Sequence, residues 1–273
     1  MGLRALTRPG QLLRRHPTAP AVLFIYAAAF LAYGGVPPAS RLAWITVAAA
    51  TARTAAWAIN RIVDVDAGRL HRIRTAALGA PPAQVSQGPA FLLAVAAALA
   101  LIIAAGQLNR LSLWLSPLPV MAFVIHPYAA RRPGAGPALC GLAHAMGPAG
   151  GWVAVRGAVE GPAYLLGGAV GLWIAGLDLL HRVAGQDAEQ TALSSAMRAH
   201  AGAAVLWVAA GWATGRAWWY FAGLAAAFVL VARRYARAAS NPAGPRPLPV
   251  LDSAAPVSLI LLAATLADLL VYP

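Results

Sequence analysis

The sequence has few of the residue types on which soluble proteins depend. Only 11% of its 273 residues are charged, whereas 60% are hydrophobic, and this balance lies well outside the range of soluble domains. The single cysteine, Cys140, excludes a disulfide framework within the chain. Lysine is absent, because all 21 basic residues are arginines. No lysine can therefore act as a catalytic base, and every basic side chain stays charged.

Long apolar runs recur along the whole length, which is typical of a polytopic helical membrane protein. No stretch between these runs exceeds roughly thirty residues. We therefore expect an all-α membrane bundle of nine transmembrane helices that forms a single integral-membrane domain over residues 1–273. The candidate spans lie at about 18–35, 42–63, 90–106, 111–128, 137–155, 162–181, 200–215, 217–233 and 250–271.

Loops that contain several arginines alternate along the chain with loops that contain one. The arginines cluster before the first span, between the second and third, after the fourth, around the loop from the sixth to the seventh, and before the ninth. The intervening loops hold one arginine each: Arg41, Arg110, Arg156 and Arg216. Because cytoplasmic loops are enriched in basic residues, the alternation predicts a multi-pass protein of the cell (inner) membrane. Its N-terminus is expected in the cytoplasm and its C-terminus outside.

Only eight acidic residues occur, and five of them lie in two short stretches. Asp64 and Asp66 belong to AINRIVDVDAGRL, while Asp178, Asp187 and Glu189 belong to GLDLLHRVAGQDAE. Both stretches fall at predicted cytoplasmic ends, of the second and the sixth span. Mg²⁺ prefers carboxylate and water oxygens, and arginines pair with phosphate, so the pattern favours a diphosphate held through a metal ion. A solvated cluster of charges at helix ends is the alternative.

The second span also carries polar residues at helical spacing. Arg53, Trp57, Asn60 and Asp64 are three or four residues apart and share one face. An arginine inside a span costs at least ~2.5–3.5 kcal/mol unless it faces a protein-lined cavity. This face therefore predicts the wall of a polar cavity, with Arg53 deep and Asp64 at the mouth. A structural ion pair inside the bundle is the other interpretation.

Asp66 has a different position on this helix. On a continuous helix, positions 64 and 66 lie about 200° apart around the axis. Asp66 would join the site of Asp64 only if the helix ended near residue 65, and Gly68 is a residue at which a helix can end.

Several segments resemble one family of membrane enzymes. ARTAAWAINRIVD (52–64) is similar to a second-helix signature with the core N-x-x-x-D-x-x-x-D, and GLDLL followed by QDAE is similar to a segment with a second motif, D-x-x-x-D. Further similar segments are RRHPTAPAVLF (14–24), SPLPVMAFVIHPYAARR (116–132) and CGLAHAMGPAGGWVAVRG (140–157). Over nearly its whole length the chain resembles the UbiA-type intramembrane aromatic prenyltransferases, especially the branch of 4-hydroxybenzoate polyprenyltransferases used in quinone biosynthesis.

This resemblance implies a chemistry and a set of site residues. Two acidic motifs hold Mg²⁺, which binds the diphosphate of an allylic polyprenyl donor and assists its departure, and an aromatic ring is then prenylated. The acceptor would be an aromatic acid such as 4-hydroxybenzoate or a naphthoate; the lipid bilayer surrounds the protein, and no nucleic-acid partner is expected. The implied catalytic residues are Asp64, Asp187 and Asn60; the metal ligands Asp64, Asp187, Asp66 and Glu189; and the substrate-binding residues Arg53, Arg61, Arg74, Tyr128, Arg131, Arg132 and Asp178.

The two motifs depart from the family pattern at matching positions. Gly68 and Thr191 stand four residues after Asp64 and Asp187, where the family has its second aspartates. Two hypotheses follow: an active prenyltransferase with a rearranged metal site, or a catalytically impaired homologue that binds an isoprenoid or quinone or supports a partner enzyme. An unrelated transporter is disfavoured, because the acidic residues lie at one membrane face and form no relay at the midplane. The length of the prenyl chain, the acceptor and the oligomeric state cannot be read from the sequence.

Overall fold

The computed structural model describes residues 19–67, 87–129, 135–183, 189–240 and 250–272, and every regular element in these ranges is helical. The all-α prediction is confirmed. The elements are α2 (Ala19–Tyr33), α3 (Ala39–Ala67), α5 (Gln87–Leu108), α6 (Arg110–Leu115), α7 (Pro117–Ala129), α8 (Ala135–Arg156), α9 (Gly161–Val183), α10 (Glu189–Ala213), α11 (Trp218–Ser240), the 3-10 turn η1 (Leu251–Ser253) and α12 (Ala254–Val271).

Each of the nine predicted spans corresponds to helical structure in the described ranges; the fourth is divided into α6 and α7, and the ninth begins with the 3-10 turn η1 before α12. The side chain of Asn109 caps α6 by accepting a hydrogen bond from the N–H of Ser112 at 2.8 Å. The division falls at Ser116, because Pro117 has no N–H to donate to the preceding turn and favours the first position of a new helix.

Six segments of the described chain are long and apolar enough to cross a membrane by length and composition, and α2 adds a shorter apolar helix, Val22–Tyr33. The six are Ala39–Val63, Gly88–Leu108, Arg110–Tyr128, Ala135–Arg156, Gly161–Arg182 and Leu251–Val271. Helices α10 and α11 are as long, with 25 and 23 residues, but α10 carries Arg198 in its first half and α11 carries three arginines in its second half. The chain is a multi-pass membrane protein.

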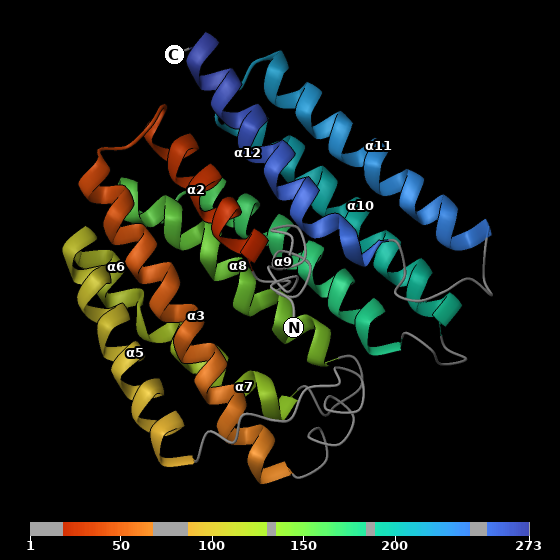
Figure 1. Cartoon of the computed structure of the whole chain (residues 1–273). Helices are drawn as coiled ribbons and strands as arrows, with labels where there is room; N and C mark the ends of the chain where they lie inside the picture. The colour runs from red at the N-terminus through yellow and green to blue at the C-terminus, as the bar shows by residue number, and fades with distance from the viewer. Residues whose placement is uncertain (1–18, 68–86, 130–134, 184–188, 241–249, 273) are drawn as a thin grey trace, which may run out of the picture. The chain divides into compact units, whose positions relative to one another are not determined.

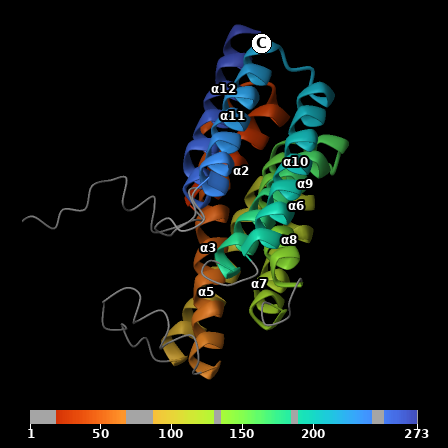
Figure 2. The same cartoon turned by 90° about the vertical axis from the view of Figure 1, so that its right-hand side faces the viewer.

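Contacts divide the chain into two compact units, residues 1–37 with 140–273 and residues 38–139. In the first unit, α9 packs along α10, and α12 packs against both α11 and α2. Figures 1 and 2 both show α11 and α12 side by side. The centre of this unit is filled by large side chains that are almost fully buried, among them Trp173, Leu180 and Leu224. Because lipid tails are as apolar as these side chains, close packing stabilises the helix contacts more than removal from water does.

Small residues allow two of these helices to approach α8 closely. A Cβ atom added at Gly141 of α8 would lie 2.4 Å from the carbonyl oxygen of Gly171 in α9. A Cβ atom added at Gly151 would lie 2.6 Å from the carbonyl oxygen of Ile25 in α2. Both distances are shorter than any real Cβ contact, so the backbones meet only because these positions are glycine, as is common in membrane bundles.

The second unit is built on α3, which packs along α5 and also contacts α7 (Figure 1). Ala58 and Ile59 of α3 meet Ala94 of α5, and Ile62 and Phe123 cover this contact. One face of α3, which includes Ala58, Ile59 and Ile62, therefore packs against the other helices of the unit.

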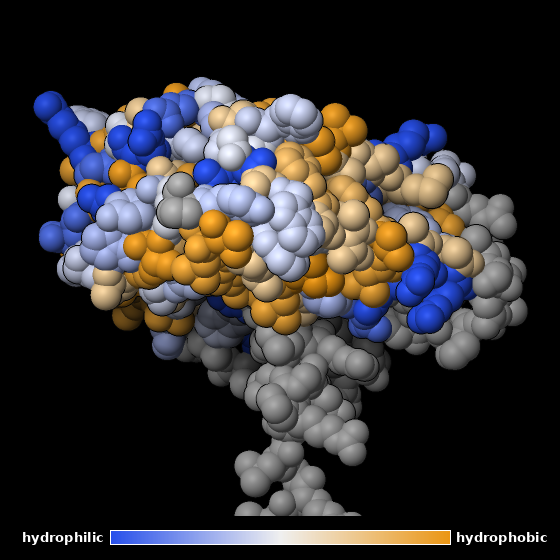
Figure 3. Space-filling view, turned by 90° about the horizontal axis from the view of Figure 1, so that it is seen from above, coloured by the Kyte–Doolittle hydropathy of each residue, from blue (hydrophilic) through white to orange (hydrophobic). Residues whose placement is uncertain are grey.

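Large apolar side chains are exposed as well as buried. In α5, Leu92 and Ile103 are 68% and 61% exposed. Figure 3 shows apolar side chains over much of the visible surface, interrupted by hydrophilic ones. A surface of this kind suits contact with lipid tails rather than with water.

Candidate functional site

The polar residues of α3 lie on the side away from the packed helices of its unit. Ala58 and Ile62 pack toward α5 and α7. Ile62 follows Arg53 by nine residues, which at about 100° per residue puts the two on opposite faces. Asn60 follows Arg53 by two turns and shares its face, and both side chains are half-buried. Arg53 and Asn60 therefore share a face that points away from α5 and α7, and Trp57, on the same face, is 51% exposed; the polar cavity along this face stays a prediction.

Arg53 carries a charge deep within a membrane span. It lies ten residues before the end of the segment Ala39–Val63, or about 15 Å along the helix axis. Its guanidinium forms no hydrogen bond or ion pair with any residue that the structure describes. The same holds for the side-chain amide of Asn60. A cation at this depth needs an anion, water or a polar cavity to offset the cost of removing it from water, so this face suits an anionic ligand.

The first acidic stretch lies at the C-terminal end of α3. The helix continues to Ala67, beyond Asp66, and so does not end near residue 65. The Cα positions of Asp64 and Asp66 are therefore about 200° apart around the axis. The side chains of both residues lie outside what the structure describes, so their roles as metal ligands stay predictions. A single ion would have to reach both sides of the helix end to bind both carboxylates.

The second acidic stretch begins in the last turns of α9. The Nε of Arg182 donates to the Oδ2 of Asp178 at 2.5 Å, and the two side chains are 30% and 18% exposed. Residues four apart on a helix can pair in this way, and the cation also lies favourably at the negative end of the helix dipole. Asp178 is thus a partly buried carboxylate with a cation already beside it. Its predicted contact with substrate stays a prediction.

The remaining predicted site residues are spread over other elements. Arg61 is half-buried on α3, and Tyr128 is 57% exposed on α7. Glu189 is the first residue of α10. Arg74, Arg131, Arg132 and Asp187 lie outside the described residues. Within the ranges that are described, no three His, Cys, Asp or Glu side chains come together as a metal site.

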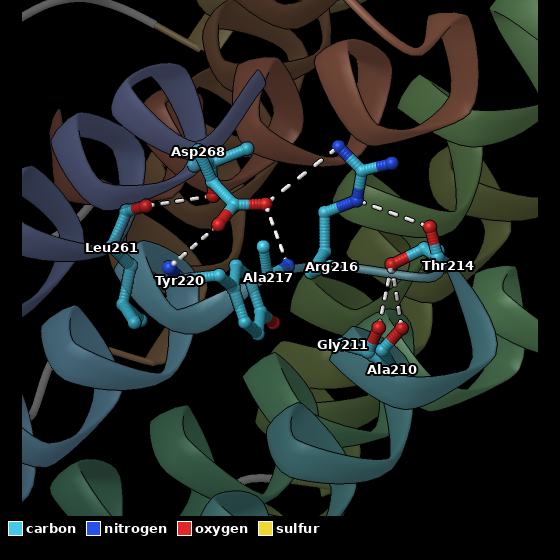
Figure 4. Close-up of polar contacts among 9 residues, drawn as sticks. Ala210, Gly211, Thr214, Arg216, Ala217, Tyr220, Leu261 and Asp268 are labelled. Atoms are coloured by element: carbon cyan, nitrogen blue, oxygen red, sulfur yellow. Dashed lines mark hydrogen bonds and ion pairs between the residues drawn. The ribbon is translucent and has the colours of Figure 1, made fainter. Parts of the chain in front are cut away.

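A buried carboxylate that sequence reasoning missed lies at the other end of the first unit (Figure 4). Asp268 of α12 is fully buried and accepts hydrogen bonds from the backbone N–H groups of Ala217 at 3.0 Å and Tyr220 at 3.2 Å. The Nη1 of Arg216 lies 3.8 Å from its Oδ2. The carboxylate thus satisfies the first turn of α11. The signal was a lone acid in the apolar run ATLADLLV, since such an acid requires partners.

Glu160, in the loop between α8 and α9, also has fixed partners. Its carboxylate accepts hydrogen bonds from Arg156, at 3.3 Å to each oxygen, and from the indole N–H of Trp152 at 2.9 Å. The hydrogen bonds from Arg156, and secondarily that from Trp152, lower the pKa of Glu160 below its usual value. The spacing of four residues between Arg156 and Glu160 is visible in the sequence and could have predicted this pair.

Known proteins are similar to this chain over most of its length. The profile of the UbiA prenyltransferase family matches residues 21–247. Among solved structures, the chain is similar to the apo structure of a UbiA homolog from Aeropyrum pernix K1, with a TM-score of 0.74 and 24% identity over 93% of this chain and 97% of that one. It is also similar to a digeranylgeranylglyceryl phosphate synthase, with a TM-score of 0.65 and 14% identity over 91% and 92% of the two chains. No curated protein sequence matches. Both structural likenesses confirm the predicted fold.

Proposed function

Because the chain belongs to the UbiA prenyltransferase family, we propose that it transfers a polyprenyl group from an allylic diphosphate to an aromatic acceptor, in the biosynthesis of a quinone or a related lipid. The observation that carries the choice of acceptor is the polar face of α3. There the cation of Arg53 lies deep in a span without a partner among the described residues.

The reaction exchanges one bond for another. The bond between the allylic carbon and the diphosphate oxygen breaks, and the electron pair leaves with the diphosphate. A ring carbon of the acceptor then bonds to the allylic carbon, and the ring loses the proton from that position. Water would compete with the ring for the allylic cation, so the site has to be closed to water. A polar cavity enclosed by the membrane bundle would meet that need.

Arginines would bind the diphosphate of the donor. Arg61, Arg74, Arg131 and Arg132 belong to the stretches that the family resemblance assigns to the mouth of the site. Guanidinium groups pair with phosphate oxygens in a bidentate manner and stay charged throughout the reaction. The amide of Asn60 can donate to an oxygen of the same ligand. These residues would hold the donor in place and offset the charge on its departing diphosphate.

Arg53 is placed for a different anion. It precedes Asp64 by eleven residues, which separates the two positions by about 16 Å along α3. A diphosphate held beside Asp64 is thus out of reach of Arg53. The carboxylate of 4-hydroxybenzoate or of a naphthoate supplies an anion at the end of an otherwise apolar ring, and Arg53 would orient that ring below the donor.

The donor set at the helix ends suits Mg²⁺. Asp64, Asp66, Asp187 and Glu189 offer only carboxylate oxygens, the ligands that this hard cation prefers. Asp64, Asp187 and Glu189 would hold the ion at the mouth, where it would neutralise charge on the departing diphosphate, whereas Asp66 lies about 200° from Asp64 around the axis of α3. The arginine pattern supports a cytoplasmic mouth, with the N-terminus in the cytoplasm and the C-terminus outside.

The test is transfer by the purified protein in lipid nanodiscs. Labelled polyprenyl diphosphates of several lengths are supplied with Mg²⁺ and one of three acceptors: 4-hydroxybenzoate, a naphthoate or a glyceryl phosphate. We expect a prenylated aromatic product that requires Mg²⁺ and is lost in Asp64→Asn and Asp187→Asn. An Asp252→Asn variant, which changes an exposed acid of η1, controls for the loss of one charge.

Two outcomes would contradict the proposal in different ways. If only the glyceryl phosphate were prenylated, the protein would be a prenyltransferase but its acceptor would not be aromatic. That acceptor would resemble the one named for the second structural neighbour. Absence of product with every donor and acceptor, beside an active family member as control, would favour the catalytically impaired homologue. Gly68 and Thr191, in place of the second aspartate of each motif, are the feature on which that alternative rests.

A further inference from the structure

His200 of α10 connects three helices of the first unit through a buried polar contact. The ring is only 4% exposed. Its Nε2 lies 3.0 Å from the carbonyl oxygen of Trp173 in α9, and its Nδ1 lies 2.8 Å from the hydroxyl oxygen of Tyr235 in α11. The ring also stacks on the indole of Trp173, with 4.2 Å between centroids. Sequence reasoning did not single out any of these residues.

The partners determine which ring nitrogen carries the proton. A carbonyl oxygen can only accept, so the Nε2–H of His200 donates to Trp173. In the neutral ring Nδ1 is then the acceptor, and the hydroxyl of Tyr235 donates to it. Both nitrogens of the ring are therefore engaged, each with a different helix.

A glycine in α9 makes this contact possible. A Cβ atom added at Gly176 would lie 2.6 Å from the Nε2 of His200 and 3.2 Å from the carbonyl oxygen of Ala196. The ring thus occupies the space that a side chain at position 176 would need. Because the ring is held by two hydrogen bonds and by stacking, it cannot move aside without losing them.

At two further glycines where α9 meets α10, the space over the glycine is filled by an apolar side chain from the other helix. An added Cβ atom would lie 3.0 Å from Leu206 at Gly168 of α9, and 3.1 Å from Leu172 at Gly202 of α10. At the third position of this series, the large side chain is His200. Interhelical hydrogen bonds add little stability in membranes, but they are directional. A leucine packed over a glycine permits small rotations of the helix, whereas these hydrogen bonds do not.

The polar contact lies close to the predicted substrate-binding part of α9. Gly176 precedes Asp178 by two residues, and Trp173 precedes it by five, which is about 7.5 Å along the axis. Any rotation of α9 about its axis at this point turns Asp178 and Arg182 by the same angle. We propose that His200 is a positioning residue, which through Trp173 and Tyr235 fixes the rotation of α9 and so aims the Asp178–Arg182 pair at the diphosphate of the donor. This inference rests on the proposed prenyl transfer.

Three variants separate the effect of the hydrogen bonds of His200 from the effect of its side-chain volume. His200→Leu keeps a large side chain over Gly176, as at Leu206, but removes both hydrogen bonds. Tyr235→Phe removes only the bond to α11 and remains testable if the leucine variant does not fold. His200→Gln is the conservative variant, because its amide can donate to the Trp173 carbonyl and accept from Tyr235. Tyr164→Phe, on a tyrosine of α9 that is 70% exposed, is the matched control.

The kinetic measurement compares the effect of each variant on the donor with its effect on the acceptor. In His200→Leu and Tyr235→Phe we expect kcat/KM for the polyprenyl diphosphate to fall about tenfold or more, as small misplacements of binding groups do. The KM of the aromatic acceptor should stay within about twofold. His200→Gln should restore most of the loss, and Tyr164→Phe should match the wild type. A folded His200→Leu protein with unchanged donor kinetics would overturn the proposal.

A second readout does not depend on activity. Spin labels at His181→Cys on α9 and Ala236→Cys on α11, in a Cys140→Ser background, report the distance between the two helices by pulsed electron spin resonance. We expect the distance distribution to shift or broaden in His200→Leu and Tyr235→Phe and to return in His200→Gln. Unchanged distributions would overturn the positioning role. If the wild type transfers no prenyl group while these distances still shift, the proposed function is wrong and the positioning of α9 by His200 stands.

Discussion

The carboxylate of Asp268, near the end of α12, accepts a hydrogen bond of 3.0 Å from the backbone N–H of Ala217, just before the first residue of α11. The two residues are 51 positions apart. A helix start is usually satisfied by a neighbouring residue of its own chain segment. Here a side chain from another helix does so, inside the protein and beside the cation of Arg216.

The loss of this carboxylate should destabilise the protein strongly. Asp268→Ala leaves the N–H groups of Ala217 and Tyr220 unpaired and Arg216 without its counter-ion. Removing one partner of a buried ion pair costs about 3–5 kcal/mol, so we expect a clear drop in the melting temperature of the purified protein. Asp252→Ala, on an exposed acid of η1, should leave it almost unchanged. Equal melting temperatures for the two variants would contradict the role assigned to Asp268.

The contact between α8 and α9 predicts opposite effects for two glycines of the same helix. Gly141→Ala places a Cβ atom against the carbonyl oxygen of Gly171, a backbone atom that cannot move aside. Overpacking of this kind costs about 1–3 kcal/mol. Gly150→Ala meets nothing within 4 Å and should be neutral or stabilising by up to about 1 kcal/mol, because alanine is the better helix former. Thermal unfolding of both variants in the same detergent tests this ordering.

Arg53→Gln should affect the acceptor more than the donor. Hydrogen bonds to charged groups contribute about 1.5–3 kcal/mol, which corresponds to a rise of roughly 10- to 100-fold in the KM of an aromatic carboxylate. The KM of the polyprenyl diphosphate should change little, because Arg53 lies too deep to reach it. Arg110→Gln, on an exposed arginine, is the control. A rise in the donor KM alone would move Arg53 to the diphosphate subsite.

The pair formed by Glu160 and Arg156 predicts a pH dependence of stability. The hydrogen bonds from Arg156 and Trp152 lower the pKa of Glu160 in the folded state, whereas the unfolded value is about 4.3. The stabilisation is therefore complete above the unfolded pKa and is lost as the pH falls through the lower folded pKa. The melting temperature of the wild type should approach that of Glu160→Gln as the pH falls below the unfolded pKa of about 4.3. Because the pair is exposed, added salt should reduce the difference, and parallel curves at all pH values would contradict this account.

The sequence predicted the helices well because membrane spans are defined locally. A run of apolar residues of sufficient length is read from the chain alone, and each of the nine predicted spans coincides with a helix in the part of the chain that the structure describes. The face shared by Arg53 and Asn60 was also predictable, since it depends only on helical periodicity. The division of the fourth span at Ser116 was not anticipated, although Pro117 and Pro119 mark it in the sequence.

Contacts between distant helices were not predictable in the same way. Asp268 finds its donors 48 and 51 residues earlier, and His200 reaches Trp173 and Tyr235 on two other helices. No spacing rule links such residues, because their meeting depends on which helices pack together and in which rotation. The pairing of Asp178 with Arg182 has the opposite character. It follows from a spacing of four residues, although the role predicted for Asp178 was contact with substrate.

The capping of α11 by Asp268 has a consequence for the order of biogenesis. During synthesis, the backbone N–H groups of Ala217 and Tyr220 emerge about fifty residues before the carboxylate that will bind them. Until α12 has been made and inserted, the start of α11 must draw its hydrogen bonds from water or lipid headgroups. The packing of α12 therefore completes the hydrogen bonding at the start of α11, the helix made before it.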